Sequence, residues 1–406
     1  MFAYINIKKI LQTNCGALPK RGADMRVIDS IEQGYVLTDG KKIIELGSMQ
    51  HFDYFKNYAH VDCSDRYVLP TYCDSHTHVV FAATRENEML QRIQGATYHE
   101  IAAAGGGILN SALRLAETSE QQLYDEALVR IDKMKKQGTG AIEIKSGYGL
   151  TIDAELKMLR VIRKLKENCG LPIKATLLAA HAFPAEYKNH KSAYVDLIVN
   201  KILPQVADEG LADYCDAFVE KGFFEIDQAR LIFEKAVALK LKIKVHANQL
   251  SYSGGVQLGC NYSAKSVDHL EYLEALDYET LSKSNTVATL LPAAAFFLNV
   301  EQANARQLID NNAIVALASD FNPGTSPSGN MNFVNTLAVL KMKMTTYEAI
   351  NASTINGAFA MDMEKKMGSL EIGKAASFII TDKLKSIDVL PYNFGDNSIH
   401  KVVLAS

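Results

Sequence analysis

The chain has 406 residues, of which 48% are hydrophobic and 22% charged, and its formal net charge is −3 at pH 7. This length and balance are typical of a folded globular protein with one large domain or two to three smaller ones. The near-neutral charge excludes a strongly basic surface, so we expect no nucleic-acid partner. The longest apolar stretch, residues 287–298, is too short to cross a bilayer and contains a proline, so we expect no membrane partner.

The cysteines and the start of the chain indicate the cellular compartment. The six cysteines are spread widely and none of them forms a C-x-x-C pair, which is typical of reduced thiols in a cytosolic protein. Residues 1–16 include two lysines but not the apolar core of a signal peptide. We therefore expect a cytoplasmic protein without a disulfide framework.

Short β-like runs occur at both ends of the chain. Residues 24–47 are divided at Asp39-Gly40, which is a hairpin signal, and residues 368–381 contain Gly373 between two apolar runs. Neither end has enough apolar residues for a sheet domain of its own. We therefore expect residues 1–65 and 365–406 to combine in one small β-sandwich domain.

Apolar runs alternate with amphipathic stretches between these two ends. The runs that resemble strands cover residues 68–75, 141–146, 174–181, 212–219, 242–246, 266–269, 286–291 and 313–319. The helix-like stretches cover residues 86–94, 97–104, 119–137, 153–168, 226–240 and 301–312. Alternation of strand and helix predicts a parallel sheet, and eight units predict a (β/α)₈ TIM-like barrel over residues 66–364. A doubly wound sheet is the structural alternative.

Four side chains at or just past the ends of these runs form a candidate metal site. His76 and His78 are two residues apart on an extended strand, so both imidazoles point to the same side. His246 ends the fifth run and Asp320 follows the eighth. Each residue alone has an ordinary structural explanation, but the carboxyl ends of barrel strands converge on one axis. Three imidazoles and one carboxylate suit one divalent ion, Zn²⁺ or Fe²⁺, with room for a bound water.

Two further histidines end strand-like runs. His269 ends the sixth run, and we expect it to act in catalysis by hydrogen bonding to the substrate carbonyl or to the attacking water. His181 ends the third run in the same way. A histidine buried in the core is the alternative explanation for each of them.

Several longer segments between residues 70 and 330 are similar to a known family. They read FAATRENE, GATYHEIAAAGGGI, IEIKSGYGL, LLAAHAFP, HANQLSYSGG, VDHLE and SDFNPGTSP. Together with the histidine pair and the late aspartate, they resemble the amidohydrolase superfamily of metal-dependent hydrolases, and within it most closely the imidazolonepropionase family. The resemblance implies a (β/α)₈ barrel and a homodimer. It also implies hydrolysis of 4-imidazolone-5-propanoate, a small anionic substrate of histidine degradation, to N-formimino-L-glutamate.

The resemblance also implies residue roles by position. His76, His78, His246 and Asp320 would bind the metal, and Asp320 would transfer protons together with His269. Arg85 would bind the substrate carboxylate, which a guanidinium can hold with two parallel hydrogen bonds. The other implied contacts to substrate or product are Tyr98, Tyr148, His181, Gln249, Asn322, Gly324 and Thr325. A surface charge is the alternative explanation for Arg85, and a packed loop residue is the alternative for Tyr148.

Three positions bear on the alternatives within the superfamily. Gln249 stands where related ring deaminases place a proton-shuttling glutamate, and Asn248 stands where an aspartate is more usual. An amide exchanges no proton at neutral pH, so both differences argue against deamination, and Gln249 becomes a hydrogen-bonding residue for the ring. Glu220 lies near the place of a bridging ligand in binuclear relatives, but we expect one metal, with Glu220 structural. The remaining alternatives are another amidohydrolase, acting on an anionic cyclic amide or an aminated heterocycle, and a non-catalytic scaffold.

Overall fold

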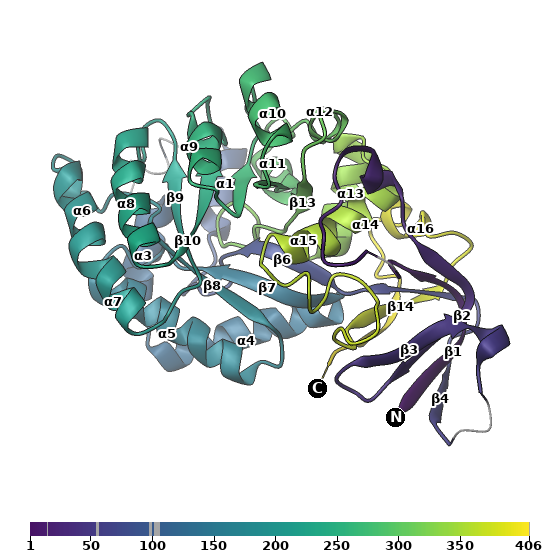
Figure 1. The fold of residues 1–406 in the computed structure, drawn as a ribbon. Helices are drawn as coiled ribbons and strands as arrows, with labels where there is room; N and C mark the ends of the chain where they lie inside the picture. The colour runs from purple at the N-terminus through teal and green to yellow at the C-terminus, as the bar shows by residue number, and fades with distance from the viewer. Residues whose placement is uncertain (14, 54–56, 97–99, 101–105, 406) are drawn as a thin grey trace.

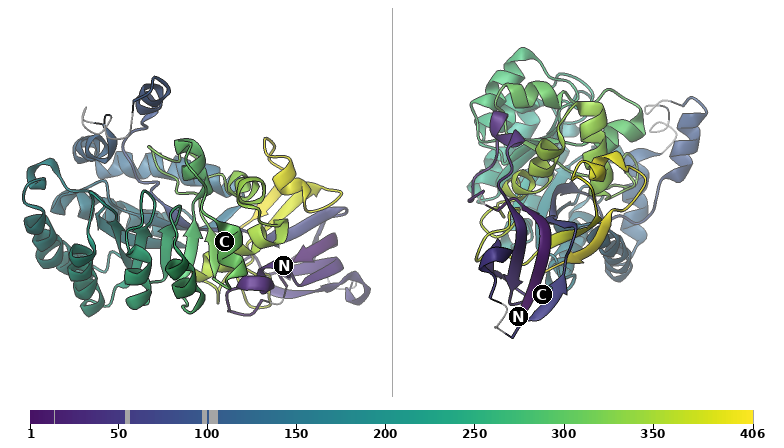
Figure 2. Two further views of the ribbon diagram at one scale, coloured as in Figure 1. Left: turned by 90° about the horizontal axis from the view of Figure 1, so that it is seen from above. Right: turned by 90° about the vertical axis from the view of Figure 1, so that its right-hand side faces the viewer.

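The structure is a computed structural model that describes the whole chain except residues 14, 54–56, 97–99, 101–105 and 406. The described residues form one sheet of eight strands and one of seven strands. Figure 1 shows the eight-stranded sheet with helices around it and the seven-stranded sheet beside it. Seen from above in Figure 2, the seven-stranded sheet lies at one end of the molecule.

The eight-stranded sheet is a barrel whose neighbouring strands are parallel and follow chain order. Its strands are β6 (Tyr72–Thr77), β7 (Thr139–Lys145), β8 (Ile173–Ala180), β9 (Tyr214–Val219), β10 (Lys242–Ala247), β11 (Ser266–His269), β12 (Val287–Leu290) and β13 (Val315–Leu317). A parallel bridge between Thr77 and Phe321 brings the segment after β13 beside β6. There the backbone N–H of His78 donates to the carbonyl of Phe321 at 2.8 Å. The predicted (β/α)₈ barrel is therefore confirmed.

Helices connect the barrel strands and cover the outside of the barrel. The α-helices are α1 (Glu86–Ile93), α3 (Gly107–Glu117), α4 (Glu120–Lys136), α5 (Ile152–Asn168), α6 (Lys191–Leu197), α7 (Leu203–Asp208), α8 (Ile226–Ala238), α9 (Gly255–Asn261), α10 (Ala275–Ser282), α11 (Pro292–Leu298), α12 (Ala305–Asp310), α13 (Met331–Met342), α14 (Thr346–Ser353), α15 (Ile355–Phe359) and α16 (Val389–Tyr392). Single turns of other helix types are η1 (Gly22–Arg26), η2 (Met49–His51), η3 (Ala185–Tyr187) and η4 (Ile198–Ile202).

Five of the predicted helices have counterparts in the structure. Those over residues 86–94, 119–137, 153–168 and 226–240 correspond to α1, α4, α5 and α8 within two residues at each end. The helix expected over residues 301–312 is shorter, because α12 begins at Ala305. The helix expected over residues 97–104 falls almost wholly outside the described residues.

The seven-stranded sheet combines both ends of the chain. In order across the sheet, its strands are β15 (Ile399–Val403), β14 (Phe378–Lys383), β5 (Arg66–Pro70), β1 (Phe2–Leu11), β2 (Ser30–Thr38) and β3 (Ile43–Ser48), with β4 (Ala59–Asp62) also pairing with β1. The hairpin signal at Asp39-Gly40 joins β2 to β3, where Thr38 pairs with Ile43. A second β unit built from both termini is thus confirmed.

The first predicted strand covers parts of two real ones. Residues 68–75 include the end of β5, in the seven-stranded sheet, and the beginning of β6, in the barrel. Both strands are buried, so the apolar pattern continues across Thr71 although the chain changes sheet there. β5 therefore belongs to the seven-stranded sheet, although residues 66–70 lie on the barrel side of our expected boundary.

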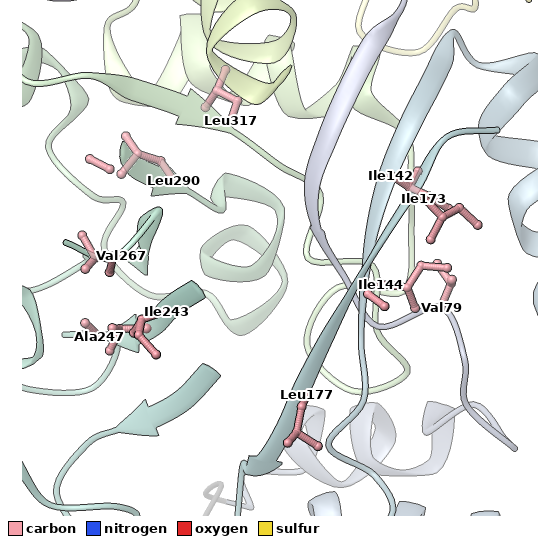
Figure 3. Packing of buried hydrophobic residues seen from close by; sticks show 14 of the residues in the cluster. Val79, Ile142, Ile144, Ile173, Leu177, Ile243, Ala247, Val267, Leu290 and Leu317 are labelled. Carbon is pink, nitrogen blue, oxygen red and sulfur yellow. The ribbon is translucent and has the colours of Figure 1, made fainter. Parts of the chain in front are cut away.

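The main hydrophobic core surrounds the barrel. Alternate strand residues such as Ile142, Ile144 and Ile243 pack outward in this core, as Figure 3 shows. Because side chains alternate along a strand, the residues between them point into the barrel. All six cysteines are free thiols. Within the described residues, no helix has both the length and the apolar character needed to cross a membrane.

Candidate metal centre and ligand cavity

The proposed ligands meet at the carboxyl end of the barrel. The Nε2 atoms of His76 and His78 lie 3.3 Å apart, and Asp320 Oδ1 lies 3.5 Å from the first and 3.6 Å from the second. The ring of His246 lies 4.5 Å from that of His76, centroid to centroid. Ligand atoms converge in two overlapping groups, His76 with His78 and Asp320, and His76 with His246 and His269. The structure thus brings all four predicted metal ligands together around His76.

The protonation states at this site suit a cation. Burial and neighbouring cationic groups hold the pKa of His76 and of His78 well below the ordinary range, so both imidazoles are neutral. His76 Nδ1 lies 2.6 Å from Asp268, which leaves its Nε2 lone pair directed at the other ligands. His246 Nε2 is buried and has no hydrogen-bond partner among the described residues. Neutral imidazoles beside a carboxylate are donors that divalent zinc or iron accepts, so these residues fit such an ion.

Backbone geometry turns two of the site residues toward the centre. Asp320 has a φ of +52° and His269 a φ of +85°, both in the left-handed region. Regular alternation would send Asp268 and His269 to opposite faces of β11. Instead Asp268 contacts His76, and the ring of His269 lies 5.3 Å from that of His246. Strained backbone of this kind is concentrated at functional sites.

The pKa values of these two residues are both raised. Burial raises the pKa of Asp320 to about 6, although His269 and His246 act in the opposite direction. Burial alone would lower the pKa of His269, but Glu271, whose Oε1 lies 3.9 Å from Nδ1, raises it above its usual value. Glu271 follows His269 by two residues in VDHLE, and the sequence analysis gave it no role. Burial thus makes the Asp320 carboxyl group a weaker acid than an exposed aspartic acid.

A cavity of about 610 Å³ opens over this cluster. It is lined by most of the residues predicted to bind substrate: Arg85, Tyr148, His181, Gln249, Asn322 and Thr325. Gly324 does not line it but lies against Arg85, because a Cβ there would be 2.2 Å from Arg85 Nη1. Tyr98 lies outside the described residues. Sequence reasoning missed Phe218, Arg92 and Phe297, which also line the cavity.

Arg85 is held at one side of the cavity by its own helix. Its Nη2 lies 2.6 Å from Glu88 Oε2, and Glu88 Oε1 accepts from the backbone N–H of Gly107 at 2.8 Å. Arg92, in the last turn of α1, donates to the carbonyl of Gly324 at 2.9 Å. Arg85 is therefore fixed by a buried ion pair with Glu88 and by its contact with the loop after β13.

The loop after β13 is organised by Asn322. Its Oδ1 accepts from the N–H groups of Gly324 at 2.8 Å and Thr325 at 2.7 Å. Its Nδ2 donates to the carbonyl of Asp320 at 2.7 Å and to the Thr325 hydroxyl at 2.8 Å. Asn322 thereby fixes Asp320 relative to Gly324, which lies against Arg85.

His181 and Tyr148 also line the cavity. His181 Nδ1 donates to the carbonyl of Gly147 at 3.0 Å, because a carbonyl can only accept. Burial lowers the pKa of His181 to about 3, so the ring is neutral, and it stacks on His78 at 5.4 Å. Glu155 accepts from the N–H groups of Gly149 at 2.7 Å and Leu150 at 3.0 Å, which holds the loop that carries Tyr148.

Comparisons with known proteins decide the family. The amidohydrolase family model matches residues 67–406. An imidazolonepropionase of Christiangramia forsetii is 48% identical over 98% of this chain and 97% of its own length. A second, from Flavobacterium johnsoniae, is 46% identical with the same coverage. The chain belongs to the imidazolonepropionase family of amidohydrolases.

The likeness to solved structures extends to the whole fold. A triazine hydrolase variant superposes with a TM-score of 0.74 at 13% identity, covering 100% of this chain and 93% of its own. At that identity, the similarity concerns the fold alone. Membership of the imidazolonepropionase family makes the chain a hydrolase that acts on a small molecule, and the family binds divalent metals.

This imidazolonepropionase family member also has a buried network of charges beneath the candidate metal centre, which sequence reasoning missed. It consists of Glu143, Lys145, Asp216, Lys244 and Asp268, none more than 1% exposed. Charged residues at alternate positions of otherwise apolar strands, as in AIEIK, are the sequence signal that could have revealed it. The sequence does not show which of these charged residues form ion pairs, because most of the pairs join different strands.

Glu220 is engaged in the backbone of the next loop. Its Oε2 accepts from the N–H of Leu250 at 2.9 Å, and its Oε1 accepts from the Ser251 hydroxyl. It belongs to neither group of converging ligand atoms. In this family member Glu220 therefore fixes the segment that begins with Gln249, a cavity residue.

Proposed function

We propose that this chain is an imidazolonepropionase that hydrolyses the ring amide of 4-imidazolone-5-propanoate to N-formimino-L-glutamate in histidine degradation. Near-full-length identity of 48% to a relative of that name supports the proposal. The single structural observation that carries it is a cavity lined both by the Arg85 guanidinium and by His78, His246 and Asp320 of the ligand cluster. This arrangement matches a substrate that has a carboxylate tail and a hydrolysable ring carbonyl.

The proposed cofactor is one divalent ion, Zn²⁺ or Fe²⁺, held by His76, His78, His246 and Asp320. When bound, such an ion lowers the pKa of a coordinated water toward neutrality and polarises the ring carbonyl. The converging neutral imidazoles and the carboxylate support this assignment.

The proton transfers are assigned to Asp320. Its carboxylate accepts a proton from water as the water oxygen bonds to the ring carbonyl carbon. As the carbon–nitrogen bond breaks, Asp320 returns that proton to the leaving ring nitrogen. His269 donates a hydrogen bond to the carbonyl oxygen while negative charge develops there. Asp320 suits both transfers because its Oδ1 faces the other ligands, 3.5 Å from His76 Nε2, while its Oδ2, 3.5 Å from the Thr325 hydroxyl, is left to exchange the proton.

The remaining cavity residues bind and orient the substrate. Arg85 would hold the propanoate carboxylate with two parallel hydrogen bonds. Gln249 would hydrogen-bond to the ring, and Tyr148, His181 and Tyr98 would line the ring and tail. Asn322, Gly324 and Thr325 would contact substrate or product.

The decisive experiment is a direct assay with freshly prepared 4-imidazolone-5-propanoate, in which loss of the ring's ultraviolet absorbance is followed. We expect chelator-sensitive loss well above spontaneous decay. No acceleration by protein that contains about one metal per chain would reject the substrate and point to another anionic cyclic amide. Protein without stoichiometric metal would instead support the scaffold alternative.

The cellular setting is a further part of the proposal. We propose a cytoplasmic homodimer, for which the six free thiols support the compartment and the family resemblance supports the dimer. Light scattering coupled to size-exclusion chromatography should give twice the chain mass, and a monomeric mass would reject the dimer.

A further inference from the structure

One buried ammonium lies between two carboxylates beneath the candidate metal centre. Lys145 Nζ lies 2.8 Å from Asp216 Oδ2 and 3.5 Å from Asp268 Oδ2. It also donates to Glu143 Oε1 at 2.7 Å. All four side chains are fully shielded from solvent. Burying an ammonium group without partners is very costly in free energy, so these carboxylates are what allow Lys145 to be buried inside the barrel.

The same two carboxylate oxygens lie next to two of the proposed metal ligands. Asp268 Oδ2 lies 2.6 Å from His76 Nδ1, and Asp216 Oδ2 lies 3.0 Å from His246 Nδ1. The other oxygen of Asp216 accepts from the backbone N–H of His246 at 3.1 Å. A carboxylate on Nδ1 fixes the tautomer in which Nε2 is free for a metal, and it sets the direction of the ring.

We propose that Lys145 is a positioning residue, which ties Asp216 to Asp268 and thereby fixes His76 and His246 in the orientation that binds the metal. This rests on the metal centre of the proposed function. Without the ammonium, two carboxylates that approach the same point would repel each other. They would then rotate apart, and that movement releases an imidazole from its fixed orientation.

Lys244 offers a matched comparison within the same network. Like Lys145, it is fully buried in the barrel. Its ammonium donates to Glu143 Oε2 and to the carbonyl of Ser75. In the described contacts it reaches neither Asp216 nor Asp268. Removal of Lys244 therefore deletes a buried cation of the same kind but leaves both histidine–carboxylate pairs tied together.

The test measures metal affinity without substrate. Metal-free wild type, Lys145→Met and Lys244→Met are titrated with Zn²⁺ in competition with a chromophoric chelator. We expect Lys145→Met to raise the Kd about 10- to 100-fold, the range for loss of groups that orient ligands. The Kd of Lys244→Met should stay within about threefold of wild type, because the ligand-orienting pairs remain. An unchanged Kd in Lys145→Met, or equal losses in both variants, would overturn the proposal.

Folding and ligand geometry are checked on the same samples. Circular dichroism and thermal unfolding of the metal-free proteins show whether each variant is folded. The visible spectrum of bound Co²⁺ should change in Lys145→Met and not in Lys244→Met. If Lys145→Met does not fold, Lys145→Gln keeps one donor for one carboxylate and should still raise the Kd about fivefold or more. An unchanged Kd in that folded variant would overturn the proposal equally.

Failure of the proposed function would be visible separately. Wild-type protein that binds no Zn²⁺ rejects the metal centre and this inference with it. Wild-type protein that binds Zn²⁺ tightly but does not hydrolyse the imidazolone rejects the substrate alone. In that case the comparison of Lys145→Met with Lys244→Met still decides the role of Lys145.

Discussion

Asp320 is the residue on which the proposed chemistry depends most. It follows β13 in the left-handed region, at a φ of +52°, and its Oδ1 faces both His76 Nε2 and His78 Nε2. Its backbone N–H donates to the carbonyl of His76 at 3.0 Å, so the main chain fixes its position independently of the carboxylate. A change confined to the side chain should therefore test its chemistry rather than its placement.

Replacement Asp320→Asn should nearly abolish turnover. Asparagine tolerates a positive φ, so the backbone should be kept. The amide cannot accept the proton of water, and loss of a general acid–base costs about 10²–10⁴-fold. The measurement is kcat together with metal content by atomic emission, and Asp208→Asn, on an exposed position, is the control. Near-normal kcat in the Asp320 variant would exclude this residue as the proton carrier.

Replacement Arg85→Ala should mainly raise KM. Arg85 lines the cavity but belongs to neither group of converging ligand atoms, so its contact with a carboxylate tail should be the same in substrate and transition state. We expect an increase of about 10²-fold in KM, and a smaller increase for Arg85→Lys, which keeps the charge but loses the paired hydrogen bonds. Steady-state kinetics measures both values. A normal KM with a low kcat would show that Arg85 does not bind the tail.

Residue-level prediction from sequence depended on local periodicity. Alternation on one strand was enough to put His76 and His78 on one side, and the structure places their Nε2 atoms 3.3 Å apart. Lys145 could not be interpreted in the same way, because its partners Asp216 and Asp268 lie on other strands. Glu271 was missed because its effect on His269 depends on a turn of the backbone at the strand end.

At the scale of elements, two segments that are distant in sequence meet at Arg85, which lines the cavity. Helix α1 contributes Arg85 at its N-terminal boundary and Arg92 in its last turn. The loop after β13 contributes Gly324, whose carbonyl accepts from Arg92 and whose Cα faces Arg85. The absence of a side chain at residue 324 is thus what allows this loop to lie directly against the guanidinium.

Replacement Gly324→Ala should displace Arg85. The new Cβ would lie 2.2 Å from Nη1, and the free end of an arginine can move where backbone cannot. We expect KM to rise about tenfold with little loss of stability, since misplacing a binding group by about 1 Å is costly to function. Steady-state kinetics and thermal unfolding measure the two effects. Gly395→Ala, where nothing lies within 4 Å of the new Cβ, is the control. An unchanged KM for Gly324→Ala would contradict the contact.

Prediction of elements succeeded where each apolar run had one environment. Seven of the eight strand-like runs each overlap a single barrel strand, because buried parallel strands are short apolar segments between helices. The run over residues 68–75 was predicted as one strand but contains parts of two. The strands β5 and β6 are both buried, and hydropathy does not show which sheet a strand joins. α12 is shorter than expected because Asn304, and not an earlier residue, caps it by accepting from the N–H of Gln307.

At the scale of the whole molecule, the candidate metal centre lies where the barrel closes. His76 and His78 belong to the first barrel strand and its end, and Asp320 follows the last strand. The backbone bonds from Asp320 to His76 and from His78 to Phe321 join these two strands at the same place. An ion bound there would link the beginning of the barrel to its end, and through His246 to β10 on the far side.

Removal of the metal should therefore lower the stability of the whole barrel. A ligand that binds only the folded state stabilises it by about 4 kcal/mol when its free concentration is a thousandfold above Kd. We expect a chelator to lower the unfolding temperature by several degrees and added Zn²⁺ to restore it, as measured by scanning calorimetry. His246→Asn, which deletes one ligand, should show a much smaller response to Zn²⁺. Equal unfolding temperatures with and without metal in the wild type would mean that these residues do not bind an ion that links the first barrel strand to the last.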